Sequence, residues 1–161
     1  MFKRLFVANR GEVASRIVRA CRELKIETVC AASTADLEAN YQYLQQADAV
    51  VCVGGSAPSS SYLQIEQLVQ AAKQSNCSAI HPGWGFLSEN NLFAAMCEQH
   101  GISFIGPDPA TMDMMSLKIP ARQAAIDAGL PVVPGSAGIL SSPEEAIKIA
   151  NEVGFPVVLK A

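Results

Sequence analysis

Short apolar runs alternate with amphipathic segments along the first two thirds of this sequence, and this alternation constrains the fold more than any other feature. Parallel strands need a helix to return the chain between them, whereas antiparallel strands need only a short turn. The alternation therefore predicts an α/β fold with a doubly wound, mostly parallel sheet. The five predicted strands cover residues 3–8, 27–32, 49–53, 77–81 and 102–105.

Composition and charge indicate which kinds of partner the sequence disfavours. Of the 161 residues, 50% are hydrophobic and 17% are charged, which is enough apolar surface for a buried core. The net charge of −3 and the lack of a basic run disfavour a nucleic acid or a membrane surface as partner. No apolar run approaches the roughly 20 residues of a membrane span, and no signal peptide fits the N-terminus. We therefore expect a cytoplasmic protein.

The cysteines are five, an odd number, and they lack the CxxC spacing of zinc and redox motifs. Most of them lie in apolar strand or helix contexts. We expect them to act as small buried hydrophobic residues in a reducing compartment. They are Cys21, Cys30, Cys52, Cys77 and Cys97.

The loop after the first predicted strand, residues 9–12, leads into a helix whose apolar residues recur from Val13 to Leu24. In a βαβ unit, this loop usually faces a nucleotide phosphate. The dinucleotide fingerprint GxGxxG is missing because Gly11 stands alone, so the pattern disfavours a dinucleotide-binding enzyme. The sequence also shows no discernible Ser/His/Asp or metal-ligating constellation.

The loop after the fourth predicted strand carries the most unusual residues. His81 and Pro82 are followed by Trp84, which stands between Gly83 and Gly85. Glycines permit positive φ and the close approach of another group. Ligands usually bind at the carboxyl ends of parallel strands, where this loop is expected. Two interpretations stay open: the indole packs on the core within a tight turn, or it faces a ligand.

The pattern changes near Asp108, after which helices predominate. Ser142, Pro143 and two following glutamates provide the N-cap, the first helical position and the early acids of a helix that ends near Val153. Brief strands are predicted at residues 132–133 and 157–160. The other predicted helices cover residues 37–46, 63–75, 88–100, 109–115 and 117–128.

Five segments occur in order along the chain: VANRGEVASRIVRACRELKIETV at 7–29, SYL at 61–63, AIHPGWGFLSEN at 79–90, ISFIGP at 102–107 and GLPVVPGS at 129–136. Together they strongly resemble biotin carboxylase, and the resemblance covers the whole chain. That family includes the carboxylase subunit of acetyl-CoA carboxylase, which serves fatty acid biosynthesis. It also includes the amino-terminal parts of pyruvate, propionyl-CoA and urea carboxylases.

The resemblance implies an ATP-grasp ligase. In this family, ATP and bicarbonate form carboxyphosphate, and the released CO2 is transferred to N1 of biotin on a carrier protein. The implied organisation is a Rossmann-like domain over residues 1–113 and the beginning of an ATP-grasp domain over residues 114–161. Lys118 and Lys160 match the two family lysines that contact the ATP phosphates. A compact positive charge is what phosphoryl transfer needs there.

Two further groups of residues match functional parts of the family. The loop that borders the active site on the biotin and bicarbonate side is matched by His81, Gly83, Trp84 and Gly85. The helix of the dimer interface is matched by Arg16, Arg19 and Glu23. The resemblance therefore implies a homodimer that works with a biotin carboxyl carrier protein and a carboxyltransferase.

The sequence also departs from the family. Ser116 and Leu117 stand where Gly and Asp are usual before the lysine, and Trp84 stands where Tyr is usual. The family's glycine-rich lid, its Mg2+-binding glutamates, and the base and arginine that bind bicarbonate come after the part matched by these 161 residues. We therefore assign no catalytic residue and no metal ligand to the chain. We expect it to be inactive alone, with residues from about 117 onward mobile unless neighbours pack on them.

Two other functions stay open. The altered Ser116 and Leu117 favour a non-catalytic Rossmann-like module for dimerisation or assembly, whereas the retained Lys118 and Lys160 favour an enzyme, because a scaffold has no phosphate to hold. A different ATP-grasp enzyme, a carboxylate–amine ligase, explains the architecture but not the HPGWGFLSEN loop.

Overall fold

The computed structural model describes residues 2–159. The chain divides into two compact units, residues 1–112 and residues 113–161. All five strands belong to the first unit, whereas the described part of the second unit consists of helices and irregular chain.

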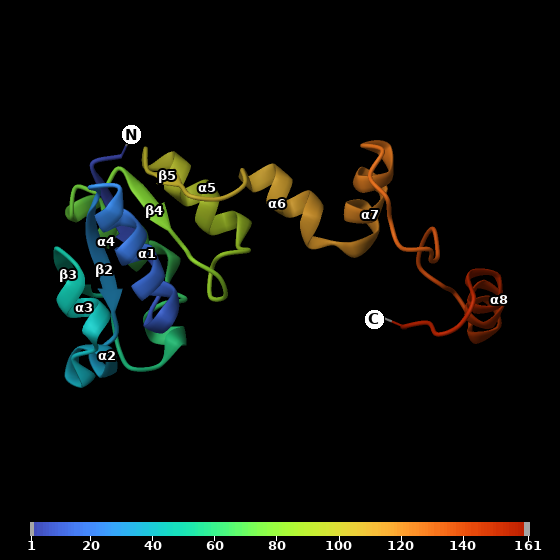
Figure 1. Ribbon diagram of the computed structural model, residues 1–161, viewed down its shortest axis with the longest axis horizontal. Coiled ribbons are helices and arrows are strands. Elements are labelled where there is room, and N and C mark those ends of the chain that lie inside the picture. The colour runs from blue at the N-terminus through green and yellow to red at the C-terminus, as the bar shows by residue number, and fades with distance from the viewer. Residues whose placement is uncertain (1, 160–161) are drawn as a thin grey trace. The chain divides into compact units, whose positions relative to one another are not determined.

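The five strands of the first unit form one parallel sheet (Figure 1). Their spatial order is β3-β2-β1-β4-β5, and every adjacent pair is parallel. The chain winds from β1 outwards to one edge and then returns to fill the other edge. This order confirms the predicted doubly wound α/β fold. The strands are β1 (Arg4–Val7), β2 (Glu27–Ala32), β3 (Ala49–Cys52), β4 (Ala79–His81) and β5 (Ser103–Phe104).

Helices cover both faces of this sheet. Neighbouring side chains of a strand point to opposite faces, so Phe6 and Val7 of β1 belong to different core clusters, and both are fully buried. The Phe6 cluster includes residues of α4 (Ile65–Gln74) and α5 (Asn91–Gln99). The Val7 cluster includes residues of α1 (Gly11–Glu23) and α3 (Gln42–Gln46).

Helix α1 follows directly from its sequence pattern. Val13, Ile17 and Cys21 recur at helical spacing and are buried against the sheet. Glu12 lies in the first turn and Arg22 in the last, and both charges complement the helix dipole. The first turn of α1 is thereby held at the carboxyl end of β1.

The single helix predicted over residues 37–46 is wrong. The structure has two helices there, α2 (Thr34–Ala39) and α3. Asn40 between them adopts a left-handed conformation with φ of 48°, which ends α2. Asparagine tolerates this conformation better than most residues.

The helix predicted to open at Ser88 begins instead at Asn91. The Asn90 side chain accepts a hydrogen bond from the Phe93 N–H at 2.9 Å and therefore acts as the N-cap. Ser88 is also a residue type that caps helices, but residues 88–90 belong to the preceding loop. Asn90 therefore sets the start of the helix.

Four of the five cysteines are buried, as predicted. Burial raises the pKa of the Cys30 and Cys97 thiols to about 12, so both remain protonated and pack as hydrophobic groups. Cys52 is the exception, because it ends the edge strand β3 and is exposed.

In the second unit, α7 (Lys118–Asp127) and α8 (Pro143–Val153) are the helices. The start of α8 is confirmed: the Ser142 hydroxyl accepts a hydrogen bond from the Glu145 N–H at 3.2 Å, and Pro143 stands at the first helical position. α6 (Pro109–Ser116) carries the chain from the first unit into the second.

The strands predicted in the second unit are wrong over the residues that the structure describes. Residues 132–133 and 157–159 are irregular, and Lys160 lies outside the described residues. Val133 is 81% exposed and Val158 is 79% exposed. A strand needs a neighbour for its backbone groups and a core for its apolar face. Neither is present, since no residue from 113 to 159 is buried.

Candidate active-site loop at the carboxyl edge of the sheet

The loops after β1 and β4 meet at the carboxyl edge of the sheet. β1 and β4 are hydrogen-bonded neighbours, but the helices that follow them, α1 and α5, pack on opposite faces. In open α/β sheets this reversal point is where ligands usually bind. The loop predicted from sequence to carry function, residues 81–85, therefore lies at the position that the topology favours.

Asn9 joins the two loops. Its side-chain amide donates to the carbonyl oxygens of Pro82 at 2.6 Å and Trp84 at 2.9 Å. Its side-chain oxygen accepts from the Arg10 N–H at 2.8 Å. Asn9 is only 3% exposed, so these bonds satisfy a buried amide and hold the loop after β4 against the loop after β1.

Gly83 makes this close approach possible. Its φ is +69°, and a Cβ at this position would overlap the Val13 side chain and lie 2.9 Å from Asn9 Nδ2. Any side chain would therefore push the loop away from α1. The sequence predicted a glycine needed for close approach, and the group that approaches is Asn9.

His81 is held in one protonation state. Its Nδ1 accepts a hydrogen bond from the Gly83 N–H at 3.0 Å, so the neutral ring carries its proton on Nε2. Burial lowers the pKa of His81, which keeps the ring neutral at pH 7. At the end of β4, His81 is thus a neutral group with one N–H still available as a donor.

Trp84 is 69% exposed, so the interpretation that its indole packs on the core is wrong. The indole Nε1–H donates to Glu12 Oε1 at 3.2 Å, which ties the ring to the first turn of α1. An exposed aromatic ring tethered by its polar edge offers a flat apolar surface to whatever binds beside it.

Arg10, the residue after Asn9, belongs to a buried polar network that was not predicted from the sequence. Asp36 is 4% exposed and accepts hydrogen bonds from Ser33 Oγ and from the Tyr62 hydroxyl, the latter at 2.7 Å. Arg10 Nη1 lies 3.6 Å from Asp36 Oδ1. The spacing of Ser33 and Asp36, an N-cap with an acid three residues later, was the available signal.

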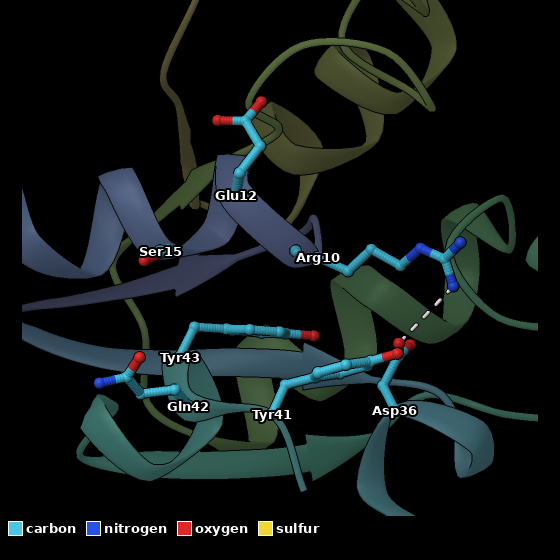
Figure 2. A pocket seen from close by; sticks show the side chains of 8 residues that line it. Arg10, Glu12, Ser15, Asp36, Tyr41, Gln42 and Tyr43 are labelled. Carbon is cyan, nitrogen blue, oxygen red and sulfur yellow. Dashed lines mark ion pairs between the residues drawn. The ribbon is translucent and has the colours of Figure 1, made fainter. Parts of the chain in front are cut away.

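Figure 2 shows the hollow beside this network, between the first turn of α1 and the segment of α2 and α3. Its volume is about 480 Å³, and the rings of Tyr41 and Tyr43 stack within it with centroids 6.2 Å apart. Burial and the Asp36 carboxylate raise the pKa of Tyr43 to about 12, so its hydroxyl stays protonated. The residues that line the hollow are Arg10, Gly11, Glu12, Ser15, Asp36, Tyr41, Gln42 and Tyr43.

The hollow lacks the free acid that binds a ribose after the second strand of dinucleotide-binding folds. Asp36 stands near that position, but its oxygens are already engaged by Arg10, Ser33 and Tyr62. This finding agrees with the missing GxGxxG fingerprint.

The remaining predicted site residues lie elsewhere. Arg16, Arg19 and Glu23 are exposed on α1, on the face turned away from the sheet. Lys118 is the first residue of α7 in the second unit. Lys160 lies outside the described residues. In residues 2–159, no three His, Cys, Asp or Glu side chains are grouped so that they could hold a metal ion, and no helix is long and apolar enough to cross a membrane.

Comparison with known proteins decides the family. Residues 1–112 match the family described as "Biotin carboxylase, N-terminal domain". The chain belongs to the biotin carboxylase family. Residues 118–161 also match the "Carbamoyl-phosphate synthase L chain, ATP binding domain".

Individual relatives extend this match over the whole chain. Biotin carboxylase 1 of Bacillus subtilis (strain 168) is 48% identical over 161 residues, which are 100% of this chain and 35% of that protein. The chloroplastic biotin carboxylase of Arabidopsis thaliana is 48% identical over 158 residues, 98% of this chain and 29% of that protein. The chain thus spans about a third of the length of the relatives it matches and corresponds to their N-terminal part.

Solved structures agree with the fold. The biotin carboxylase domain of a thermophilic 2-oxoglutarate carboxylase bound to bicarbonate superposes with a TM-score of 0.87 at 45% identity, covering 100% of this chain and 36% of that one. A biotin carboxylase complex from Campylobacter jejuni gives a TM-score of 0.85 at 43% identity, covering 97% of this chain and 34% of that one.

Proposed function

We propose that this chain forms the N-terminal part of an enzyme that uses ATP and bicarbonate to carboxylate biotin on a carrier protein. The observation that carries the proposal is the loop from His81 to Gly85, which presents an exposed Trp84 at the carboxyl edge of the sheet in a chain that matches biotin carboxylases over its full length. The enzyme would be a cytoplasmic ATP-dependent ligase.

The loop would border the pocket for biotin and bicarbonate. Trp84 would provide an aromatic wall for the planar ring of biotin, and the neutral His81 would offer its Nε2–H as a donor. Gly83 would hold the loop against Val13 and Asn9, and Gly85, where a Cβ would meet no atom within 4 Å, would let the ligand approach the backbone closely. The exposed indole and the fixed histidine tautomer support these roles.

Lys118 and Lys160 would bind the phosphates of ATP, in an ATP-grasp domain that begins near residue 114 and follows a Rossmann-like domain over residues 1–113. The N-terminus of a helix favours an anion, and Lys118 is the first residue of α7. Leu117, where the family usually has an acid, makes no side-chain cap there and is 63% exposed. Mg2+, which neutralises phosphate charge when bound, would take its ligands from residues outside this chain.

Arg16, Arg19 and Glu23 would contribute to a homodimer interface. All three lie on the exposed face of α1, and the charged face of one helix can pair with complementary charges on a partner. The solved biotin carboxylase domain of the Hydrogenobacter thermophilus 2-oxoglutarate carboxylase is described as a dimer in complex with MgADP and bicarbonate. A biotin carboxyl carrier protein and a carboxyltransferase would be the other partners.

A non-catalytic assembly module is the second candidate. The first unit contains a complete core with two buried clusters, whereas the described residues of the second contain none. A folded domain with an exposed charged helix is sufficient for dimerisation, and it needs no phosphate ligand. Retention of Lys118 weighs against this function.

The test is ATP hydrolysis by the full-length protein that carries this chain, with and without bicarbonate and biotin. We expect hydrolysis that depends on bicarbonate, and no turnover by the 161 residues alone. Lys118→Ala should lower kcat/KM for ATP about 100-fold, the usual loss for a group that stabilises developing charge. Lys73→Ala, an exposed lysine on α4, is the matched control and should retain wild-type activity. An ATP hydrolysis rate that is the same with and without bicarbonate would contradict the proposal.

A further inference from the structure

Tyr62 belongs to the SYL segment at residues 61–63, and its contacts indicate a role besides packing in the core. The residue is fully buried. Its hydroxyl donates to Asp36 Oδ2 at 2.7 Å and accepts from the Ser33 N–H at 3.1 Å. A phenol with both its donor and its acceptor engaged is held at its hydroxyl end, so the loop after β2 fixes the position of this end of the ring.

Asp36 makes this anchor rigid. A buried carboxylate is stable only when its oxygens are paired, and those of Asp36 are contacted by Ser33 Oγ, the Tyr62 hydroxyl and Arg10. The Arg10 guanidinium carbon also lies 5.9 Å from the centre of the Tyr62 ring, within the range of a cation–π contact. Hydrogen-bonded buried groups such as Ser33, Asp36 and Tyr62 rigidify the structure around them.

The ring of Tyr62 meets the loop that follows β4. It stacks on Phe86, with centroids 5.1 Å apart and an angle of 7° between the ring planes. Phe86 has a φ of 42°, a left-handed conformation that costs a bulky L-residue roughly 1–2 kcal/mol. Such strain persists only where the surroundings enforce it, and it gathers at functional sites. Phe86 lies two residues after Trp84.

Trp84 is therefore held from both sides. Asn9 binds the carbonyl oxygens of Pro82 and Trp84, and the stack on Tyr62 retains Phe86. We propose that Tyr62, anchored by Asp36, is a positioning residue: it keeps Phe86 in its left-handed conformation and thereby, together with the Glu12 contact of the indole, sets the direction in which the Trp84 indole projects. That the indole so directed serves biotin rests on the proposed function.

The positioning role is tested on the 161-residue chain by 15N relaxation. Trp84 is the only tryptophan, so a single indole N–H signal accompanies the backbone amides of Trp84 and Gly85. Tyr62→Phe keeps the ring and removes the hydroxyl with all its hydrogen bonds. We expect the order parameters of these groups to fall from about 0.85, the value of rigid backbone, to below about 0.6. Phe86→Leu, at a partly exposed residue, removes the stack and should have the same effect.

Tyr41→Phe is the matched control. Tyr41 is half exposed and stacks on Tyr43. Its loss of a hydroxyl should leave the loop order parameters unchanged. Unchanged values in both Tyr62→Phe and Phe86→Leu, or an equal fall in Tyr41→Phe, would overturn the proposal. If Tyr62→Phe does not fold, as judged by circular dichroism, Phe86→Leu decides.

The full-length enzyme separates this proposal from the proposed function. Tyr62→Phe should raise the KM for free biotin about tenfold or more through misplacement of the loop, with the KM for ATP unchanged. A wild-type enzyme without bicarbonate-dependent ATP cleavage would refute the proposed function, and the relaxation result would still decide the positioning role. An active wild type whose KM for biotin is unaffected by Tyr62→Phe would refute the role of Tyr62.

Discussion

The two units of this chain carry helix signals of similar clarity, yet only one of them is a packed structure. Residues 1–112 bury two clusters on the faces of a parallel sheet, and residues 113–159 contain no buried residue. α8 has a better N-cap than α1, whose Arg10 makes no side-chain cap hydrogen bond. Capping and helical periodicity therefore specify where a helix lies, whereas burial against other elements supplies its stability.

The largest expected difference between the two units is the loss of unfolding free energy when an apolar side chain is truncated. Phe6→Ala removes a fully buried ring from the centre of the sheet and should lower the free energy of unfolding by about 3–5 kcal/mol. Ile147→Ala on α8, at a residue that is 63% exposed, should change it by less than about 0.5 kcal/mol. Urea denaturation followed by circular dichroism measures both. Similar losses would show that the second unit packs as tightly as the first.

A smaller effect is expected within the first unit, at the two glycines of the loop. Gly83→Ala should destabilise the protein by about 1–3 kcal/mol, because the new Cβ overlaps Val13 and the φ is positive. Gly85→Ala is the matched control: its φ of +72° is similar, but a Cβ there meets no atom within 4 Å. It should cost only about 1 kcal/mol, the backbone contribution alone. Equal losses in thermal denaturation would mean that the contact with Val13 and Asn9 is unimportant.

The N-cap of α8 tests whether the two units unfold independently. Ser142→Ala removes the acceptor for the Glu145 N–H and should weaken α8 by about 1 kcal/mol. Amide hydrogen exchange should speed up within α8 alone, and the protection of β1 and β4 should stay unchanged. Faster exchange in the sheet would indicate that the two units unfold together.

The smallest expected effect concerns pH. The folded protein holds the pKa of His81 below its unfolded value of about 6.5, through burial. The folded state therefore binds fewer protons, and this contribution to stability is present above pH 6.5 and is lost as the pH falls below it. His81→Gln should flatten the decline of stability between neutral and mildly acidic pH. An identical decline in both proteins would contradict the buried, neutral histidine.

Much of this fold was predictable because its signals are local or repeat along the chain. The five apolar runs predicted all five strands, and Ser142 with Pro143 predicted the start of α8. The failures arose where a distant partner decides. Val133 is apolar and β-branched, but without a strand beside it the segment stays irregular. Asn90 and Asn40 altered helix boundaries through single side-chain or backbone conformations that periodicity does not encode.

The candidate site, too, was predictable from the sequence only where its signals are local. Trp84 between two glycines identified the functional loop in the sequence. The position of this loop after the fourth predicted strand placed it at the carboxyl edge of the sheet. The groups that hold the loop come from elsewhere in the sequence: Asn9 lies 73 residues before Pro82, and Tyr62 and Asp36 meet only after folding. Long-range hydrogen bonds leave no periodic pattern in a sequence, so these anchors could not be predicted from it.

The central claim is that the loop from His81 to Gly85 presents Trp84 to biotin. The most direct test is the kinetics of biotin carboxylation by the full-length enzyme in three forms: wild type, Trp84→Ala and Trp84→Tyr. Trp84→Ala should raise the KM for biotin about tenfold, the loss expected on removal of an aromatic contact of about 1.4 kcal/mol, with the KM for ATP unchanged. Trp84→Tyr should restore most of the affinity. A KM for biotin that is the same in all three forms would contradict the account.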